Sequence, residues 1–249
     1  MAVETNHSLS VDCVIFGYQD EALKVLLVEQ HIPASLSDSY HHHNNDNPSK
    51  WLKLPGSMIL EDESLPEAAQ RVLFNMTGLD EVYLKQTEIF SSPKRVTGAE
   101  LEWIATFHKI TTKRVVTVGY YALIQITQEQ LEHTDQKGAI WVNIEEVPPL
   151  ALDHTDILQH TLKVMRDDFE RSPIIFEMLP KKFIISDLQK IYSTVMGIQI
   201  DNRNFRKKIL GQNIITATGE RQSGVAHKPA EYFTFNLEEY QKNRRKGLI

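Results

Sequence analysis

Residues 64–79 carry the strongest helical pattern in the chain. Apolar residues recur there at spacings of three and four, which aligns them along one face of a helix about four turns long. That face comprises Leu65, Ala68, Ala69, Val72, Leu73 and Met76. Ser64 followed by Glu67 is the pattern of a capping box, and Gly78 supplies a left-handed stop. The segment therefore predicts a capped helix that packs one face on a core.

Apolar, β-branched segments surround this helix. Two such runs at residues 11–19 and 22–30, joined by a polar turn at residues 19–21, predict a β-hairpin. Further strands are expected within residues 82–90, 114–126 and 139–144, and a second helix within residues 154–169. In that second helix, one side carries Ile157, Leu158, Leu162 and Met165. Strands around one central helix, with another helix at the end, predict an α+β sandwich.

The composition is that of a globular chain without export signals. Of 249 residues, 41% are apolar and 24% are charged, so a sizeable core can form. No apolar run is long enough for a transmembrane helix, and the polar N-terminus differs from a signal peptide. Cys13 is the only cysteine, which excludes an intramolecular disulfide. We therefore expect a cytoplasmic protein with no membrane partner.

Residues 31–50 abandon any periodicity and predict a long surface loop. The loop contains His41, His42 and His43, which could in principle hold a transition metal. Adjacent side chains in an irregular loop do not converge on one ion, and no cysteine or carboxylate lies at ligand spacing. We expect no metal site and no cofactor.

The charge is divided unevenly along the chain. Residues 1–170 carry 13 Lys and Arg against 26 Asp and Glu, whereas residues 171–249 carry 14 against 7. The net charges of −13 and +7 add to the overall −6. This asymmetry predicts an acidic body at residues 1–171, followed by a domain at residues 172–249 that binds a polyanion. A merely solvated basic tail is the alternative.

The basic part has the elements of a winged helix-turn-helix. A short apolar helix ending near Pro180 is followed by a helix that Ser186 caps and Gly197 stops. Next comes a basic helix in which Phe205 and Ile209 face inward, and then two strands flank a glycine-containing loop. In such a module the second helix of the motif enters the major groove and the wing contacts the backbone. The candidate DNA-binding residues are Arg203, Asn204, Arg206, Lys207 and Lys208 on the helix, and Arg221, His227 and Lys228 on the wing.

Residues 56–79 resemble the Nudix box. The positions that match are Glu63, Arg71, Leu73, Gly78 and Leu79, while the first glycine of the box falls on Ser57, directly after Gly56. The three helix carboxylates of a Nudix hydrolase would fall on Val72, Asn75 and Met76. Those carboxylates hold divalent cations that activate water, and hard cations need oxygen ligands. The resemblance therefore implies a Nudix-like α/β/α sandwich with a mixed sheet and without hydrolytic activity.

Residual acidic groups leave one alternative open. Glu61, Asp62, Glu63 and Glu67 could rebuild a metal site, although acidic side chains at a helix N-terminus are also explained by the helix dipole. An active Nudix hydrolase with a nucleic-acid-binding tail is therefore a rival interpretation, and a C-terminal protein-interaction module is a third.

Residues 183–235 resemble the C-terminal domain of the Nudix-related transcriptional regulators. The matching positions are Leu188, Gln189, Tyr192, Asp201, Arg203, Asn204, Phe205, Arg206, Lys207, Lys208, Thr218, Gly219, His227, Lys228, Pro229 and Ala230. Residues 115–123 and 153–158 also resemble the Nudix body of this family.

The family resemblance implies a homodimeric repressor that binds double-stranded operator DNA and is released by a small-molecule effector. Effectors in the family are sugars such as arabinose, or ADP-ribose in regulators of NAD metabolism. We predict that the effector is a sugar and that the protein acts in carbohydrate catabolism, because the missing carboxylates remove the metal ions that usually bind a diphosphate. ADP-ribose is the alternative effector. The candidate effector-binding residues are Lys53, Ser57, Glu63, Arg71 and Arg114.

Overall fold

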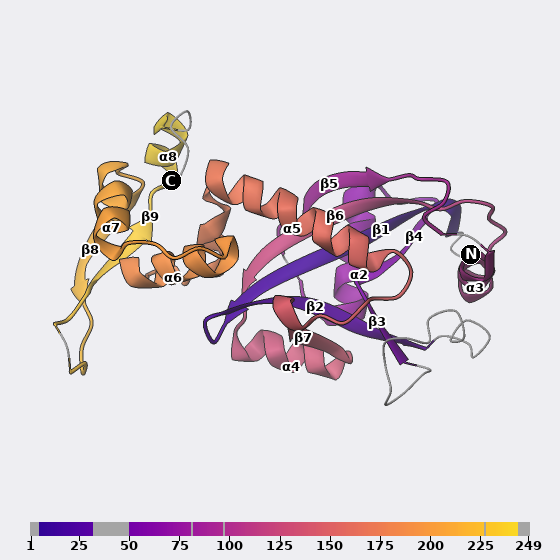
Figure 1. Ribbon diagram of the computed structural model, residues 1–249, viewed down its shortest axis with the longest axis horizontal. Helices are drawn as coiled ribbons and strands as arrows, with labels where there is room; N and C mark the ends of the chain where they lie inside the picture. Colours follow the sequence, from indigo (N-terminus) through magenta and orange to yellow (C-terminus); the bar gives the residue numbers. More distant parts are fainter. Residues whose placement is uncertain (1–4, 32–49, 81, 97, 227, 244–249) are drawn as a thin grey trace. The chain divides into compact units, whose positions relative to one another are not determined.

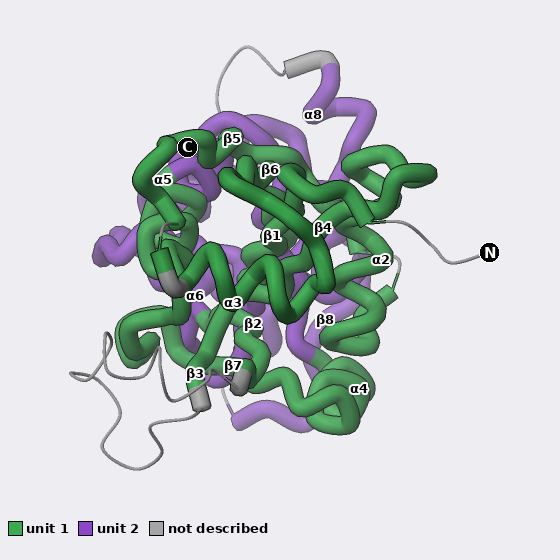
Figure 2. Tube along the Cα trace, turned by 90° about the vertical axis from the view of Figure 1, so that its right-hand side faces the viewer, with its two compact units in different colours: residues 1–16, 24–122, 127–163 green, residues 17–23, 123–126, 164–249 purple. Residues whose placement is uncertain are grey.

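The computed structural model describes residues 5–31, 50–80, 82–96, 98–226 and 228–243. The chain forms two compact units, shown in Figure 2: residues 1–16, 24–122 and 127–163 make the first, and residues 17–23, 123–126 and 164–249 the second. The predicted boundary between residues 171 and 172 stays a prediction. The histidines at positions 41–43 lie outside the described residues.

A seven-stranded sheet is the centre of the described N-terminal part. Its strands are β1 (Thr5–Gln19), β2 (Ala22–His31), β3 (Lys50–Lys53), β4 (Gly56–Leu60), β5 (Lys85–Phe90), β6 (Val116–Gln125) and β7 (Ala139–Asn143). The main path runs β3-β2-β1-β6-β5, with β4 on β1 and β7 on β2. Strands β1 and β6 are neighbours that run in the same direction. Towards the start of the two strands, the hydroxyl of Ser10 on β1 is hydrogen-bonded to that of Thr117 on β6. Towards the end of the two strands, Tyr18 of β1 and Gln125 of β6 line the same cavity. Since β2 pairs with β7 in antiparallel register, the sheet is mixed.

Helices cover both faces of this sheet. Figures 1 and 2 show α2 (Leu65–Thr77) on one face and α5 (His154–Arg171) on the other. The buried stretch from Ser10 to Phe16 in β1 is continuous, as expected for a strand covered on both sides. The remaining elements here are α3 (Gly98–His108), α4 (Gln128–Gln136) and the 3₁₀ helix η2 (Ile144–Glu146).

The predicted ends of α2 are confirmed. The Glu67 carboxylate accepts hydrogen bonds from the backbone N–H and the hydroxyl of Ser64, at 2.8 and 2.6 Å. Gly78 has a φ of 76°, and its N–H donates to the Phe74 carbonyl. The predicted apolar face is buried at Ala68, Ala69, Val72 and Leu73 and half-buried at Leu65 and Met76.

The second unit contains η3 (Pro173–Met178), α6 (Ile185–Met196), α7 (Asn202–Gly211), β8 (Ile215–Arg221), β9 (Glu231–Phe235) and α8 (Leu237–Asn243). The first element is a short helix, as predicted, and is of the 3₁₀ type. The predicted cap of the next helix was wrong. Helix α6 begins at Ile185, and Ile184 occupies the cap position, so the expected cap Ser186 lies inside the helix. The earlier start is stabilised because Ile185 packs into the core and the Asp187 carboxylate accepts a hydrogen bond from the Ile184 N–H.

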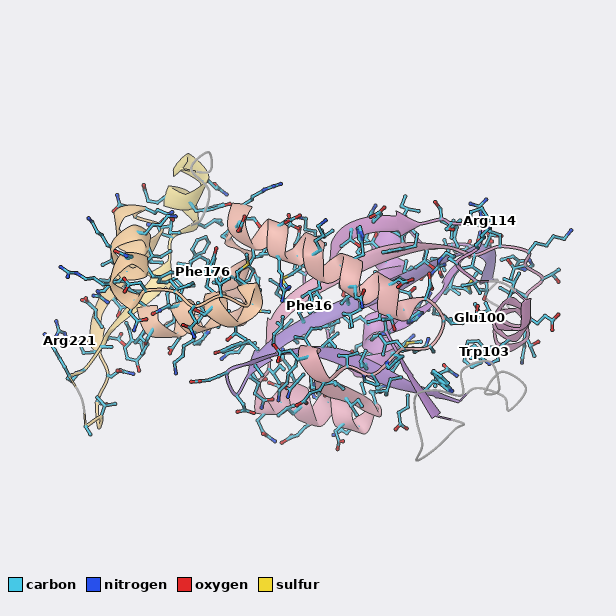
Figure 3. All side chains as sticks on the ribbon, in the orientation of Figure 1. Phe16, Glu100, Trp103, Arg114, Phe176 and Arg221 are labelled. Atoms are coloured by element: carbon cyan, nitrogen blue, oxygen red, sulfur yellow. The ribbon has the colours of Figure 1, made fainter. Side chains whose placement is uncertain are left out.

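Aromatic side chains hold the second unit together. Phe176, labelled in Figure 3, stacks on Phe235 with ring centroids 4.1 Å apart. Tyr192 lies between Phe169 and Phe205, at 5.8 and 6.0 Å. Such pairs add directional attraction to the burial of their apolar surface. One group joins the end of α5 to α6 and α7, and the other joins η3 to β9 of the wing.

The turn between β1 and β2 also belongs to the second unit. Asp20 and Glu21 adopt φ values of 52° and 61°, as a tight two-residue hairpin turn requires, so the predicted hairpin is confirmed. The Lys190 ammonium on α6 donates to the Glu21 carboxylate at 2.5 Å, and the Thr194 hydroxyl donates to the Glu21 carbonyl at 3.3 Å. Across the described part of the chain, no helix is both long and apolar enough to span a membrane.

Two glycine substitutions should show where the fold requires the absence of a side chain. We expect Gly78→Ala to destabilise the protein by about 1–2 kcal/mol, because its left-handed φ disfavours a side chain and the added Cβ would lie 3.1 Å from the His133 carbonyl. Gly211→Ala, in α7 with open space around it, should be neutral or slightly stabilising. Urea unfolding of both variants is the measurement, and equal losses of stability would contradict this explanation.

Candidate functional site

A cavity of about 50 Å³ lies between α3 and the sheet. Strands β1, β3, β4 and β6 supply its polar floor, which includes Ser10, Asp12, Lys53, Ser57 and Thr117. Helix α3 supplies an aromatic side through Trp103, Phe107 and His108. The cavity therefore offers charged and hydrogen-bonding groups on one side and flat apolar rings on the other.

Three buried ionisable groups occupy the floor: Asp12, Lys53 and His154. The Lys53 ammonium donates to the Gly56 carbonyl at 2.9 Å. The Leu54 N–H donates to His154 Nδ1 at 2.9 Å, so the ring proton of the neutral imidazole lies on Nε2, 3.8 Å from Asp12 Oδ1. These contacts fix the orientation of all three side chains.

Burial governs the protonation of this cluster. It raises the pKa of Asp12 to about 6, although the positive charges of Lys53 and Arg95 oppose the rise. Burial, and next the Lys53 charge, lower the pKa of His154 to about 3. Burial also lowers the pKa of Lys53, which the Asp12 charge opposes. At neutral pH the floor therefore presents a carboxylate from Asp12 and a neutral imidazole from His154, beside a lysine whose charge burial disfavours and Asp12 favours.

Gly56 makes room for the Asp12 carboxylate. The two residues face each other in the antiparallel pair of β1 and β4. A Cβ at Gly56 would lie 1.7 Å from Asp12 Oδ1 and 3.0 Å from the Val11 carbonyl. This close approach explains why the chain needs its glycine at position 56 while position 57 can be serine.

Arg95 links three segments around the cavity. Its guanidinium binds both carboxylate oxygens of Asp153, at 2.7 and 2.9 Å, and donates to the Thr117 hydroxyl at 2.7 Å. That hydroxyl is 2.6 Å from the hydroxyl of Ser10. Bidentate arginine–carboxylate pairs are geometrically specific, so this network holds the start of α5 against β6 and β1.

The structure brings together only part of the predicted effector-binding set. Lys53 and Ser57 line the cavity. Glu63 and Arg71 instead pair with each other at 2.5 and 2.7 Å. Arg114 is exposed and donates to the Ser91 carbonyl at 2.5 Å; Figure 3 labels it.

The Glu63–Arg71 pair connects β4 to α2. Arg71 also donates to the Met58 carbonyl at 3.1 Å, and Glu63 accepts from the Leu60 N–H at 2.7 Å. Burial raises the pKa of Glu63, but the hydrogen bonds from Arg71 and Leu60 outweigh it and keep that pKa below its ordinary value. Glu63 and Arg71 therefore stabilise the packing of α2 against β4 in this chain.

Sequence reasoning missed Asp12, Arg95, Trp103, His108 and His154 as cavity residues. Asp12 offered a signal, since it is a charge inside an apolar strand. His154 lay in a segment noted for its helical pattern and its family resemblance, and the other three offered no signal. Val72, at the first missing carboxylate position, is buried, and Asn75 is exposed. Among the described residues no group of three or more His, Cys, Asp or Glu is placed to hold a metal ion.

The predicted DNA-binding side chains lie on one helix and one hairpin. Phe205 and Ile209 are buried, as predicted. The exposed residues of α7 include Arg203, Asn204, Arg206, Lys207 and Lys208. Arg221, labelled in Figure 3, and Lys228 are exposed on the wing, while His227 lies outside the described residues. The Asp201 carboxylate caps α7 by accepting from the Asn204 N–H at 2.8 Å.

Comparison with known proteins identifies both parts of the chain. The model of the NUDIX domain matches residues 6–161, and that of the NrtR DNA-binding winged helix domain matches residues 175–235. The chain therefore belongs to the NUDIX family and carries an NrtR-type winged helix domain. This confirms the predicted fold class and the predicted order of the two modules.

Relatives of full length share this arrangement. An ADPR responsive transcriptional repressor, NtrR, from Acinetobacter baylyi is 28% identical over 94% of this chain and 84% of its own. The crystal structure of Shewanella oneidensis NrtR complexed with a 27mer DNA has a TM-score of 0.69 at 22% identity, covering 94% of this chain and 95% of that one. A MutT/nudix family protein from Enterococcus faecalis has a TM-score of 0.63 at 22% identity, covering 94% and 88%.

These relatives bear on the predicted function. The A. baylyi protein is a transcriptional repressor, as the regulator hypothesis expects of a relative. Its effector corresponds to the alternative, ADP-ribose, and none of these relatives supports the preferred prediction of sugar catabolism.

The buried histidine should make stability depend on pH. An unfolded histidine takes up a proton below pH 6.5, whereas His154 stays neutral down to about pH 3, so stability is lost as pH falls through that window. At pH 5.5 the loss from this group is about 1.4 kcal/mol. We expect His154→Gln to lose less stability between pH 7.5 and 5.5 than the wild type, measured by urea unfolding.

Two features make this comparison specific. Asp12 titrates in the opposite sense, because its raised pKa stabilises the fold as pH falls towards 4, but it is present in both proteins. His133→Gln, at an exposed position on α4, is the matched control. An identical pH dependence for wild type and His154→Gln would contradict the assignment.

Proposed function

We propose that this protein is a DNA-binding transcriptional repressor of the NrtR type and that ADP-ribose is its effector. The observation that carries the proposal is the combination of a Nudix domain at residues 6–161 with an NrtR-type winged helix at residues 175–235. The 28% identity to an ADPR responsive repressor supports the choice of effector over a sugar.

The effector would bind in the cavity of the Nudix domain. Asp12 is a buried acceptor suited to the hydroxyl groups of a ribose, and Lys53 is a buried cation suited to a phosphate. Neither contact requires a metal ion. The loss of carboxylates at Val72, Asn75 and Met76 therefore removes a route to hydrolysis without removing a way to hold a phosphorylated ligand.

The DNA would bind the second unit. The buried pair Phe205 and Ile209 aims the opposite, cationic face of α7 outward. A homodimer would present two such helices, with half-site centres about one turn of DNA apart or a multiple of it. We further propose that residues 1–171 sense the effector and residues 172–249 bind DNA.

A ligand comparison tests the choice of effector. ADP-ribose should raise the melting temperature of the full chain, because a ligand that binds only the folded state stabilises it, and arabinose should not. Chromatography of the ADP-ribose after incubation with Mg²⁺ should recover it intact. Stabilisation by arabinose alone would restore the sugar hypothesis, and metal-dependent cleavage of ADP-ribose would favour the rival hydrolase.

Two adjacent cations on α7 should differ in what they do on DNA. Consecutive helical residues differ by about 100° in direction, so only one of Arg206 and Lys207 can face base edges squarely. We expect Arg206→Ala to cost about 1–3 kcal/mol on the operator and relax one base preference. Lys207→Ala should weaken operator and random DNA alike and lower the salt slope by about one.

Fluorescence anisotropy over a salt series is the measurement. Lys113→Ala, an exposed lysine in the Nudix domain, is the control and should change neither DNA affinity nor salt slope. Equal losses on operator and random DNA for both variants would show that α7 contacts only the backbone, and base recognition would then be assigned to the wing.

A further inference from the structure

Helix α3 presents two aromatic rings at the mouth of the cavity. Trp103 and Phe107 are four residues apart, which places them on the same face of the helix. Their ring centroids are 5.6 Å apart with planes inclined by 33°. Both rings line the cavity.

The two rings differ in how firmly they are held. Trp103 packs against a buried cluster that includes Met58, Ile104 and Val115, which anchors α3 to the sheet. Phe107 is 51% exposed although it lines the cavity. The Phe107 ring also meets the His108 ring edge-on, with centroids 5.0 Å apart. The arrangement is therefore a packed ring, Trp103, beside a second ring that is half exposed.

The size of the cavity limits what can enter its floor. A cavity of about 150 Å³ is known to hold benzene, whereas this one measures about 50 Å³. Neither a purine nor a whole ribose can therefore be enclosed beside Asp12 and Lys53, and only single groups such as a hydroxyl or a phosphate oxygen reach the floor from the open side. A planar base has room only on the open side, against the exposed part of Phe107.

We infer that α3 recognises the base of the effector: the adenine ring stacks on Phe107, supported by Trp103, while ribose or phosphate groups meet the polar floor. This inference rests on the proposed function. It divides the cavity into a floor that recognises a sugar phosphate and a helix that recognises a flat aromatic ring. A free sugar such as arabinose has no group that could stack on Phe107.

Calorimetric titration of the full-length protein with ADP-ribose and with ribose 5-phosphate, which lacks the base, tests this division. We expect Phe107→Ala to weaken ADP-ribose binding about 5- to 150-fold, because the variant loses the stacking of the base on an aromatic side chain. Binding of ribose 5-phosphate should be unchanged, and Phe107→Trp should retain ADP-ribose affinity. Phe74→Ala is the matched control, since this ring is 48% exposed on α2 and lies outside the cavity.

Tryptophan fluorescence gives a second readout. ADP-ribose should quench the emission of the wild type more than that of Trp103→Phe, which keeps an aromatic ring at the position. The inference is overturned if Phe107→Ala changes ADP-ribose affinity no more than Phe74→Ala does, or if it weakens both ligands equally. It is also overturned if Trp103→Phe is quenched as fully as the wild type.

Failure of the proposed function has a different signature. A wild type that binds ADP-ribose but keeps its affinity for DNA would refute the repressor mechanism and leave the stacking result valid. A wild type that does not bind ADP-ribose at all would overturn both the choice of effector and the role of α3.

Discussion

The burial of Asp12, Lys53 and His154 at one end of the sheet is the constraint on which the candidate site depends. Removing ionised groups from water costs several kcal/mol each unless opposite charges and hydrogen bonds compensate. Here the carboxylate and ammonium offset each other, the imidazole stays neutral, and the Gly56 carbonyl and the Leu54 N–H complete the hydrogen bonds. Loss of any one member leaves the others in an unfavourable environment. The floor is therefore a fixed arrangement.

Several of those elements are tied to the floor by directed contacts. His154 is the first residue of α5, and its ring accepts the Leu54 N–H beside β3. Asp153, the residue before His154, pairs with Arg95 in the segment that follows β5. Helix α5 then continues without a break to Arg171, and its last residues belong to the second unit. One continuous helix is thus anchored at the candidate effector cavity and shared by both units.

Features that depend on local periodicity could be predicted from the sequence. The apolar stripe and stops of α2, the hairpin turn and the inward pair Phe205 and Ile209 follow from spacing over a few residues. The floor could not be predicted, because its contacts join residues far apart: 100 positions separate Leu54 from His154, and 58 separate Arg95 from Asp153. Sheet topology brings them together. Glu63 and Arg71 matched the motif and bind each other, and their predicted part in effector binding stays a prediction.

The Nudix box of this chain separates into a structural part and a chemical part. Glu63 and Arg71 still bridge β4 and α2, and Gly78 still ends the helix. Position 72 holds a valine that is 1% exposed and adds to the core, where an ionised carboxylate at the same depth would need compensating charges. The substitution therefore favours the fold while it removes a metal ligand. Asp12 and Lys53 lie on strands and His154 begins α5, so the polar character of the cavity does not depend on carboxylates of α2.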